Sequence, residues 1–535
     1  MPVHFDHDTA ERGPRLRPWA PAGGDAAIVP ALPASGKSGN LQCLRALAAS
    51  LVVVHHLAIY GQLARGAARP FPGLDAAMGA WGVYIFFALS GFLMAGLVLR
   101  DSPDVFLASR IGRIVPTYLA VVALFFALST GLGLEFGGIS VLALSLAPVG
   151  PRSYPLAVEW TLVYEMAFYV GLFLVAVAGL ARRLVPLTIG WVAVLAAATL
   201  LLPPGSAHVV PPPAYLLPLS APCLPFAGGL LLPTLISRGW VRPASALLAL
   251  PLAFACLWVD AVSGCWLGGI AAVLVVGAAA TAPPVRRQGP VVRGLLALGD
   301  WSYVLYLVHA PILLLASRLC PPHWSALAYG AVSVGGALAA TALIGPLDVA
   351  FHRHLRGWIS GLRPVRLRQG LTVFLMIFAG CAVWGSGETT RNDLAEARAR
   401  RILAKLPAET WTSPAQAEGV IAGLNRGLPS SLRGAVEDVA RPNPAEWLVR
   451  GFAFDPDQPD RRLHLAVFCG GRLVALDRPR RVRRDLADAP GYEGLGRRRI
   501  GYSVHVPADA CAVGPMIAVI VDSSGRMAPL AVPQG

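Results

Sequence analysis

The sequence predicts an all-α polytopic membrane protein, with about ten core transmembrane helices and an eleventh, followed by a small all-β sandwich-like domain. Of its 535 residues, 55% are hydrophobic and only 14% are charged, against roughly 25% charged in soluble domains. The apolar residues come in blocks of about 17 to 24, long enough to cross a hydrocarbon core of about 30 Å. After the last block the pattern changes to a period of two, which is typical of strands.

The first segment, residues 1–40, is polar and rich in proline. It lacks the basic and then apolar layout of a cleavable signal peptide. A segment with so few apolar residues has no core to bury. We therefore expect a disordered cytoplasmic tail.

The membrane domain is expected over residues 41–360, and residues 361–442 should hold the eleventh helix and a linker. The segment 139–149 is apolar but too short to span, so we expect it to be interfacial or re-entrant. The candidate spans are 42–62, 79–99, 113–133, 156–179, 185–202, 215–236, 243–259, 264–282, 296–317, 325–346 and 369–386.

Arginines in the loops predict the topology. Four arginines lie in one set of alternating loops (Arg65, Arg69, Arg152 and Arg318), and fifteen lie in the other: Arg100, Arg110, Arg113, Arg182, Arg183, Arg238, Arg242, Arg286, Arg287, Arg293, Arg353, Arg356, Arg363, Arg366 and Arg368. The loops rich in basic residues remain in the cytoplasm. We therefore expect a multi-pass protein of the bacterial inner membrane with a cytoplasmic N-terminus and an extracytoplasmic C-terminal domain.

The net charge of +15 raises the question of a nucleic-acid partner. The basic residues are scattered between apolar blocks and form no single basic face. Loops that set topology and contact anionic membrane lipids explain them better, so no nucleic-acid partner is expected.

The β domain is expected over residues 443–535. Four segments alternate with period two and are broken by the turns CGGR and DSSGR: EWLVRGFAF, LHLAVFCGGRLVAL, IGYSVHVP and MIAVIVDSSGRMAPLAV. Cys469 and Cys511 both lie here, on the oxidising side of the membrane, although two cysteines in a sequence leave their pairing open. The other six cysteines lie in or beside apolar segments without metal-ligand spacing, so no metal site is predicted.

Ionisable residues inside the spans are candidates for function, because burying them in lipid is costly. Arg45 begins the first span, the pair His55 and His56 lies deep within it, Glu165 lies in the fourth span and His309 in the ninth. At 1.5 Å per residue, His56, Glu165 and His309 all lie about 15–20 Å from the membrane edge. Arg45 precedes His56 by eleven residues, close to three helical turns, so both lie on one helix face. We expect one shared buried site.

Five segments in order resemble the membrane acyltransferase-3 family, which includes O-antigen and exopolysaccharide O-acetylases. They are RALAASLVVVHHLAIYG with its Arg-x10-His spacing, WGVYIFFALSGFLM, RIGRIVPTY, WTLVYEMAFY and LGDWSYVLYLVHAPIL. The likeness covers roughly residues 40–355. Two features depart from the family pattern: the Glu-x-Pro-x-Arg motif is absent from LDVAFHRHLR, and His55 competes with His56 for the histidine position.

The resemblance implies transfer of an acyl group, with acetyl expected, from cytoplasmic acyl-CoA to a carbohydrate or lipid-linked glycan acceptor. Acyl-CoA is then a donor substrate, and no bound cofactor is expected. An alcohol needs a base near neutral pH, which imidazole provides. The expected catalytic residues are His56, Arg45, Glu165 and His309, the donor phosphates are assigned to Arg110 and Arg113, and Ser90, Ser302 and Tyr303 support the site by hydrogen bonding. Direct transfer and transfer through an acyl-histidine both stay open.

Two other classes of protein compete with this interpretation. A transporter or flippase of a lipid-linked glycan or small polar solute also needs buried charges, but the sequence shows no inverted repeat and no paired broken helices. A catalytically silent scaffold is disfavoured by the intact set of buried ionisable residues. The β domain shows no nucleophile motif and is interpreted as a binding or spacing module. Its clustered arginines are expected either to contact an acidic glycan or anionic lipid headgroups or to form a solvated basic surface: Arg478, Arg480, Arg481, Arg483, Arg484, Arg497, Arg498 and Arg499.

Overall fold

The computed structural model describes residues 39–533, apart from 66–71, 135, 204–208, 286–288, 322, 408–410, 412, 426–430, 444–445, 459–460, 484–485, 487–497, 512–514 and 523. The predicted tail up to residue 38, and Arg69, Arg286, Arg287, Arg484 and Arg497, lie outside the described residues. The chain divides into a helical unit ending at Ser386 and a β unit beginning at Gly387.

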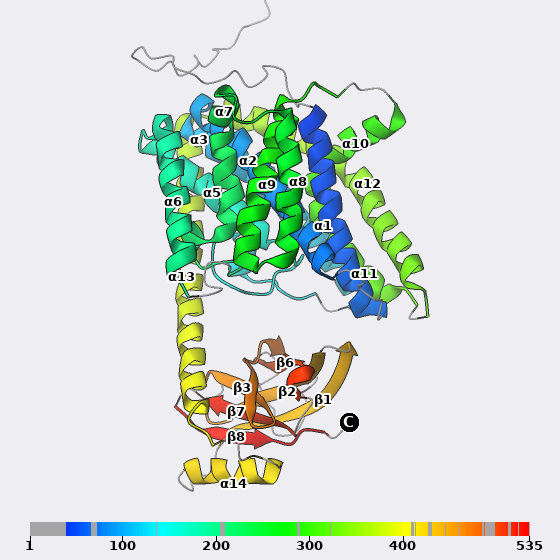
Figure 1. Ribbon diagram of the computed structural model, residues 1–535, viewed down its shortest axis with the longest axis vertical. Coiled ribbons are helices and arrows are strands. Elements are labelled where there is room, and N and C mark those ends of the chain that lie inside the picture. The colour runs from blue at the N-terminus through cyan, green and yellow to red at the C-terminus, as the bar shows by residue number, and fades with distance from the viewer. Residues whose placement is uncertain are drawn as a thin grey trace, which may run out of the picture. The chain divides into compact units, whose positions relative to one another are not determined.

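The helical unit is a bundle of long apolar helices (Figure 1). Among the described residues, nine helices are long and apolar enough to cross a membrane, and two shorter apolar stretches cover Ala221–Ser237 and Pro243–Trp258. Together they correspond one to one with the eleven predicted spans. The helices are α1 (Gly39–Arg65), α2 (Pro72–Arg100), α3 (Pro103–Gly131), α4 (Val141–Leu144), α5 (Trp160–Val177), α6 (Leu184–Leu201), α7 (Leu224–Ser237), α8 (Ala246–Ala255), α9 (Ala261–Thr281), α10 (Pro290–Asp300), α11 (Ser302–Leu319), α12 (Ala326–Gly361) and α13 (Pro364–Leu403).

Three predicted boundaries are wrong in ways that matter for the site. α3 begins at Pro103, ten residues before the predicted span, because a proline fits the first turn of a helix. Arg110 and Arg113 are therefore one turn apart on a helix and do not lie in a loop. α12 continues through Pro346 to Gly361, and the predicted ninth span breaks at Trp301 into the amphipathic α10 and α11.

The short apolar segment 139–149 behaves as expected and does not span. It forms only the four-residue helix α4, and Val149 makes an isolated bridge to Pro213. Ser386 Oγ donates to Pro148 O at 3.3 Å and accepts from Ala214 N at 2.9 Å. These bonds tie the end of the last span to two loops at the same edge of the helical unit.

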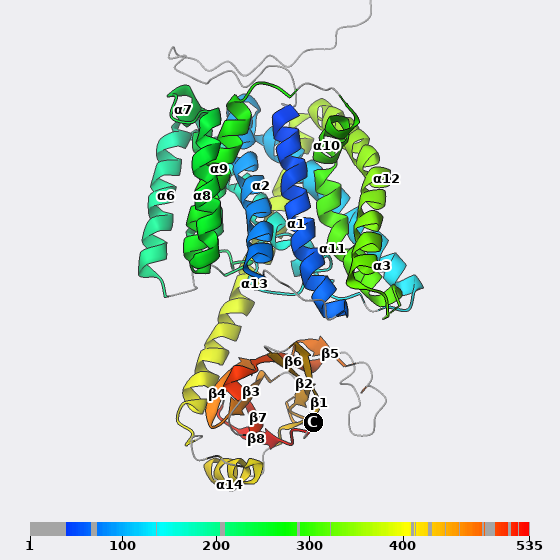
Figure 2. The same cartoon turned by 45° about the vertical axis from the view of Figure 1, so that its right-hand side comes forward.

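Close helix contacts depend on glycine. α2 packs on α7, where a Cβ on Gly91 would collide with Phe226 O and one on Gly229 would collide with Ala88 O. Small residues let helices approach closely in a membrane, where dispersion forces drive their association. This contact fixes α2. In turn, α2 lies beside α1, and α1 lies beside α11 (Figure 2).

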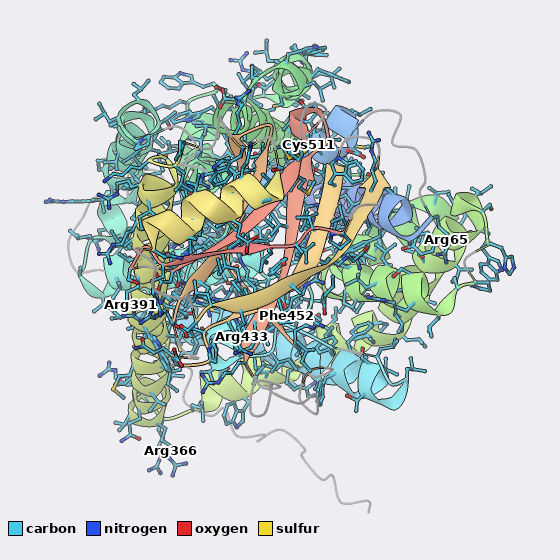
Figure 3. The ribbon with its side chains drawn as sticks, turned by 90° about the horizontal axis from the view of Figure 1, so that it is seen from below. Arg65, Arg366, Arg391, Arg433, Phe452 and Cys511 are labelled. Carbon is cyan, nitrogen blue, oxygen red and sulfur yellow. A yellow bond between two sulfur atoms is a disulfide. The ribbon has the colours of Figure 1, made fainter. Side chains whose placement is uncertain are left out.

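Arginines at helix ends point outward. Arg366 extends away from the first turn of α13 (Figure 3). Arg368 makes an exposed ion pair with Asp104 at 2.9 Å. Both arginines belong to the set that the sequence predicts to face the cytoplasm.

The β unit is a sandwich of two antiparallel sheets, with strand orders β1-β2-β6-β5 and β4-β3-β7-β8. Its core joins both sheets, with Val449 and Val504 from one packing against Leu465 and Ile520 from the other. The strands are β1 (Arg433–Asn443), β2 (Glu446–Phe454), β3 (Leu463–Cys469), β4 (Arg472–Asp477), β5 (Arg481–Val482), β6 (Arg499–Pro507), β7 (Met516–Asp522) and β8 (Met527–Leu530).

Helices cover the outer face of the second sheet. Ala399 and Leu403 of α13 and Ile421 of α14 (Pro414–Leu424) pack against Phe468 and Val519. The 40-residue α13 runs on to Leu403, well beyond the predicted end of the eleventh span at residue 386. Because its last turns belong to the β unit, the residues assigned to a linker contribute a third layer to this unit.

Two further features of the β unit bear on the predictions. Cys469 and Cys511 form a disulfide, and Gly470 and Gly471 close the β3–β4 hairpin with φ of 53° and 77°. The predicted linker also holds β1, so the first strand begins about ten residues earlier than expected. In the arginine cluster, Arg483 pairs with Glu437 at 2.5 Å and Arg480 with Asp477 at 2.8 Å. Part of that cluster is therefore neutralised within the unit. In Figure 3, Arg433 and Phe452 lie on the strands β1 and β2 of the sheet with strand order β1-β2-β6-β5.

Candidate active site

The site begins where α1 packs on α11. Arg45 Nε donates to Ser302 Oγ at 3.2 Å, and farther along the same two helices His56 Nδ1 lies 3.2 Å from His309 Nε2. Eleven residues on α1 are three turns and seven residues on α11 are two turns, so each pair lies on one face of its helix. The face predicted for Arg45 and His56 is the face that contacts α11.

The hydrogen bonds of the histidine pair determine its tautomers. His56 Nδ1 lies 3.0 Å from Val52 O, and His309 Nδ1 lies 3.0 Å from Leu305 O. A carbonyl oxygen only accepts, so both Nδ1 atoms carry the proton in the neutral rings. His309 Nε2 then accepts from His56 Nδ1, and His56 Nε2 keeps its lone pair. When His56 acts as a base, its Nε2 gains a proton and its ring becomes positively charged. His309 Nε2 accepts a hydrogen bond from His56 Nδ1 and so stabilises the charged ring.

His55 faces another helix. Its Nδ1 lies 2.9 Å from Asp75 O, and its ring fills the space that a Cβ on Gly79 of α2 would occupy. Adjacent helical residues point about 100° apart. His56, and not His55, therefore faces α11.

A cavity of about 200 Å³ lies beside this pair. Seven of the nine predicted site residues line it: Arg45, Ser90, Arg110, Arg113, Glu165, Ser302 and Tyr303. His56 and His309 do not line it, but the ring of the lining residue Tyr306 lies 5.8 Å from that of His309. The structure thus places the nine residues in two adjoining groups, a charged cavity and a histidine pair.

Glu165 is the carboxylate of the cavity. It interacts electrostatically with Arg45, Arg110 and Arg113. Tyr169, one turn farther along α5, donates to Glu165 Oε1 and lies 3.4 Å from Ser90 Oγ. This geometry makes Glu165 a counter-charge to Arg45.

Arg113 is held in a buried ion pair. Its Nη1 donates to Asp348 Oδ2 of α12 at 2.6 Å, and Thr117 Oγ1 donates to Asp348 Oδ1 at 2.6 Å. Its guanidinium also lies over the ring of Tyr303, 4.9 Å from the centroid. Arg113 thus lines the cavity and at the same time joins α3, α11 and α12.

Arg110 lacks an ion pair of the kind that holds Arg113. Its Nε and the Nδ1 of His352 are buried without a hydrogen-bond partner among the described residues. Both side chains line the cavity and interact electrostatically. Three arginines and one carboxylate, Glu165, line the cavity, and Asp348 pairs with Arg113 behind it, so positive charge is in excess among the lining residues. A buried excess charge is costly, and an anionic group would neutralise it.

Four residues of the candidate site were not predicted from the sequence: Tyr169, Tyr306, Asp348 and His352. Tyr169 follows Glu165 by four residues, a spacing that places both on one helix face. Asp348 and His352 were assigned to a loop, because the tenth span was ended at residue 346. In LDVAFHRHLR, where the Glu-x-Pro-x-Arg motif is absent, an acid remains at Asp348 and takes part in the site.

Metal binding finds no support in the described segments of the chain. Within them no group of three or more His, Cys, Asp or Glu side chains could hold a metal ion.

Comparison with known families agrees with this architecture. A family model described as an acyltransferase domain matches residues 38–345, more than half of the chain. These residues include α1 to α11 and most of α12. Comparison with curated proteins and with solved structures gives no match.

Proposed function

The chain belongs to the membrane acyltransferase-3 family, and we propose that it moves an acyl group, with acetyl expected, from cytoplasmic acyl-CoA to a hydroxyl group of a cell-envelope carbohydrate. Its membrane acyltransferase activity follows from the family. The donor, the acceptor and the roles of the residues are our proposal.

The observation that carries the proposal is the pairing of His56 with His309 beside a cavity lined by arginines. Acyl transfer to an alcohol needs a base for the hydroxyl proton and positive charge for the anionic donor. His56 Nε2 supplies the first and Arg110 the second. His309 of α11 holds the His56 ring in place by the contact between His309 Nε2 and His56 Nδ1.

In the proposed reaction, the acceptor hydroxyl loses its proton to His56 Nε2 while its oxygen attacks the thioester carbonyl. The new C–O bond forms, the C–S bond breaks, and the CoA thiolate leaves with the proton from His56. His309 stabilises the intermediate imidazolium by accepting from His56 Nδ1. The same Nε2 lone pair is the nucleophile in the route through an acyl-histidine, and acid quenching with radiolabelled donor separates the routes, because only the second leaves label on the protein.

Arg110 and Arg113 are proposed to contact the phosphates of acyl-CoA. Guanidinium groups match phosphate oxygens in geometry and charge. Arg110, with its unpartnered Nε, is the better placed of the two, since Arg113 is already paired with Asp348. We place the protein in the bacterial inner membrane, with the N-terminus and these arginines on the cytoplasmic side.

The test is mass spectrometry of envelope polysaccharides from wild-type cells, deletion cells and deletion cells carrying His56→Ala. The proposal predicts an acyl mass increment in the wild type that disappears in the other two. If the deletion leaves every acyl group in place but abolishes export of a glycan, the protein is a transporter and the proposal is wrong.

A further inference from the structure

The cavity extends from the neighbourhood of the histidine pair to the last turns of α12. Tyr306, whose ring lies beside that of His309, and His352 of α12 both line it. Gly336 of α12 lies against Ile312, less than one turn beyond His309 on α11. His352 follows Gly336 by sixteen residues, which is about 24 Å along the helix axis. The cavity therefore connects the histidine pair with a distant part of α12.

Contacts with α3 fix this part of α12. Asp348 forms its ion pair with α3, and two turns farther on Leu355 Cδ2 lies 3.0 Å from the place where a Cβ would stand on Gly112 of α3. The missing side chain at Gly112 lets the two helices approach closely. Because Asp348, His352 and Arg356 follow one another at intervals of four residues, they share the face of α12 that meets α3.

His352 carries an unused hydrogen-bonding group at this end of the cavity. Its Nδ1 and the Nε of Arg110 are buried without a hydrogen-bond partner among the described residues, although both side chains line the cavity. Leaving such groups unsatisfied costs free energy. The Nε of Arg110 donates, and so does Nδ1 of His352 in the tautomer that carries its proton there. Acceptor atoms of a bound molecule would satisfy both groups.

The charges around His352 favour an anion. Arg110, Arg113 and Arg356 interact electrostatically with it, against the single carboxylate of Asp348, which is already paired with Arg113. Arg356 is exposed, and no carboxylate within the described ranges forms an ion pair with it. Positive charge is therefore in excess along this face of α12. Phosphate groups match guanidinium and N–H donors in charge and in geometry.

We propose that His352 and Arg356 complete the donor site: His352 and Arg110 hold the diphosphate of acyl-CoA, and Arg356 contacts the phosphate on its ribose. The order follows from the chemistry of the donor. Its thioester must reach His56, its uncharged pantetheine arm follows the cavity, and its diphosphate lies at the end of that arm. The ribose phosphate lies still farther from the thioester, as exposed Arg356 lies one turn beyond His352.

This inference rests on the proposed acyltransferase function and adds to it two donor-binding residues. Both lie beyond residue 345, where the match to the family model ends.

The experiment compares three donors. It uses the purified full-length protein in an uncharged detergent without anionic lipid, and polysaccharide extracted from deletion cells as acceptor. The donors are acetyl-CoA, acetyl-dephospho-CoA, which lacks only the ribose phosphate, and S-acetylpantetheine, which has no phosphate. The readout is kcat/KM for each donor. A lost phosphate contact changes the ratios between donors, whereas a general loss of activity lowers all three values equally.

His352→Ala should lower kcat/KM for acetyl-CoA and for acetyl-dephospho-CoA about ten- to hundredfold, because both contain the diphosphate. The value for S-acetylpantetheine should stay within about twofold of the wild type, since no phosphate contact is lost. His352→Asn keeps an N–H group near the place of Nδ1 and should recover part of the loss. It also carries the test if His352→Ala folds poorly.

Arg356→Ala should affect acetyl-CoA alone. Because this side chain is exposed, we expect its loss to lower kcat/KM only about two- to fivefold. High salt should reduce the difference from the wild type, since it screens exposed charges. Acetyl-dephospho-CoA and S-acetylpantetheine should be used as the wild type uses them.

His354→Ala and Arg366→Ala are the matched controls. His354 is exposed, two residues from His352 and so on another face of α12, and its Nδ1 lies 2.8 Å from Ala350 O. Arg366 carries the same charge as Arg356 but extends away from the first turn of α13 (Figure 3). Neither substitution should change kcat/KM for any of the three donors.

Three results overturn the inference while the proposed function stands. The His352 variants keep the wild-type values, or they lower the values for all three donors by the same factor, which indicates a structural role. In the third, the differences between donors appear only after phosphatidylglycerol is added, which shows that a lipid phosphate occupies the site. A wild-type protein that transfers no acetyl group from any donor overturns the proposed function, and this inference with it.

Discussion

Replacing Arg113 by alanine tests how the charged cavity is built. The side chain of Asp348 is only 1% exposed, and that of Arg113 is 19% exposed. Without Arg113 the carboxylate keeps the Thr117 hydroxyl and no opposite charge. Removing one partner of a buried ion pair costs about 3–5 kcal/mol. We therefore expect Arg113→Ala to destabilise the protein by about this amount as well as weakening donor binding.

Arg110→Ala should weaken donor binding with little effect on the stability of the protein. No ion pair joins Arg110 to a described carboxylate, so its loss leaves no carboxylate stranded and should change the free energy of unfolding much less than the loss of Arg113 does. If it holds a donor phosphate, its loss should raise the KM for acyl-CoA about ten- to hundredfold. Lysine at position 110 should recover only part of this, because it lacks the planar fork.

The assay combines unfolding of the detergent-purified variants in mixed micelles with donor titration. A double-mutant cycle gives the sharper result. Arg113→Ala combined with Asp348→Ala should cost less than Arg113→Ala alone plus Asp348→Ala alone by at least about 2 kcal/mol, since no charge is left unpaired. Additive costs for the two substitutions would refute the ion-pair argument.

Three other predictions follow from the geometry. His56→Ala should abolish turnover while acyl-CoA still binds, whereas His55→Ala should keep substantial activity, as measured by separate binding and turnover assays; an inactive His55→Ala with an active His56→Ala contradicts the assignment. A phosphatase fused to the C-terminus should be active in intact cells, because the arginine distribution of fifteen against four predicts that this end lies outside; a fusion active only in the cytoplasm overturns the topology. Replacing Cys469 and Cys511 by serine should lower the stability of the β unit by about 2–4 kcal/mol in thermal unfolding, and unchanged stability would show that the disulfide contributes nothing.

The predicted strands illustrate what local pattern provides. β2, β3, β6 and β7 lie where the period-two alternation places them. β1 was missed because its sequence, RGAVEDVARPN, does not alternate cleanly. Its pairing with β2 shifts register between Val436 and Asp438, and a bulge interrupts the period of two. Only the partner strand shows that this segment is extended.

The candidate site likewise depends partly on local sequence pattern and partly on contacts between distant segments. The sequence by itself determined the number of apolar helices, because lipid demands long apolar runs, and it determined that Arg45 and His56 share a face of α1, because helical geometry is local. Tertiary structure alone decided which groups meet: His56 with His309 across 253 residues, and Arg113 with Asp348 across 235. The physical reason is that periodicity encodes which way a side chain points from its own helix axis. How far one helix is displaced along another depends on side-chain packing between segments distant in the chain, and no local pattern records that displacement.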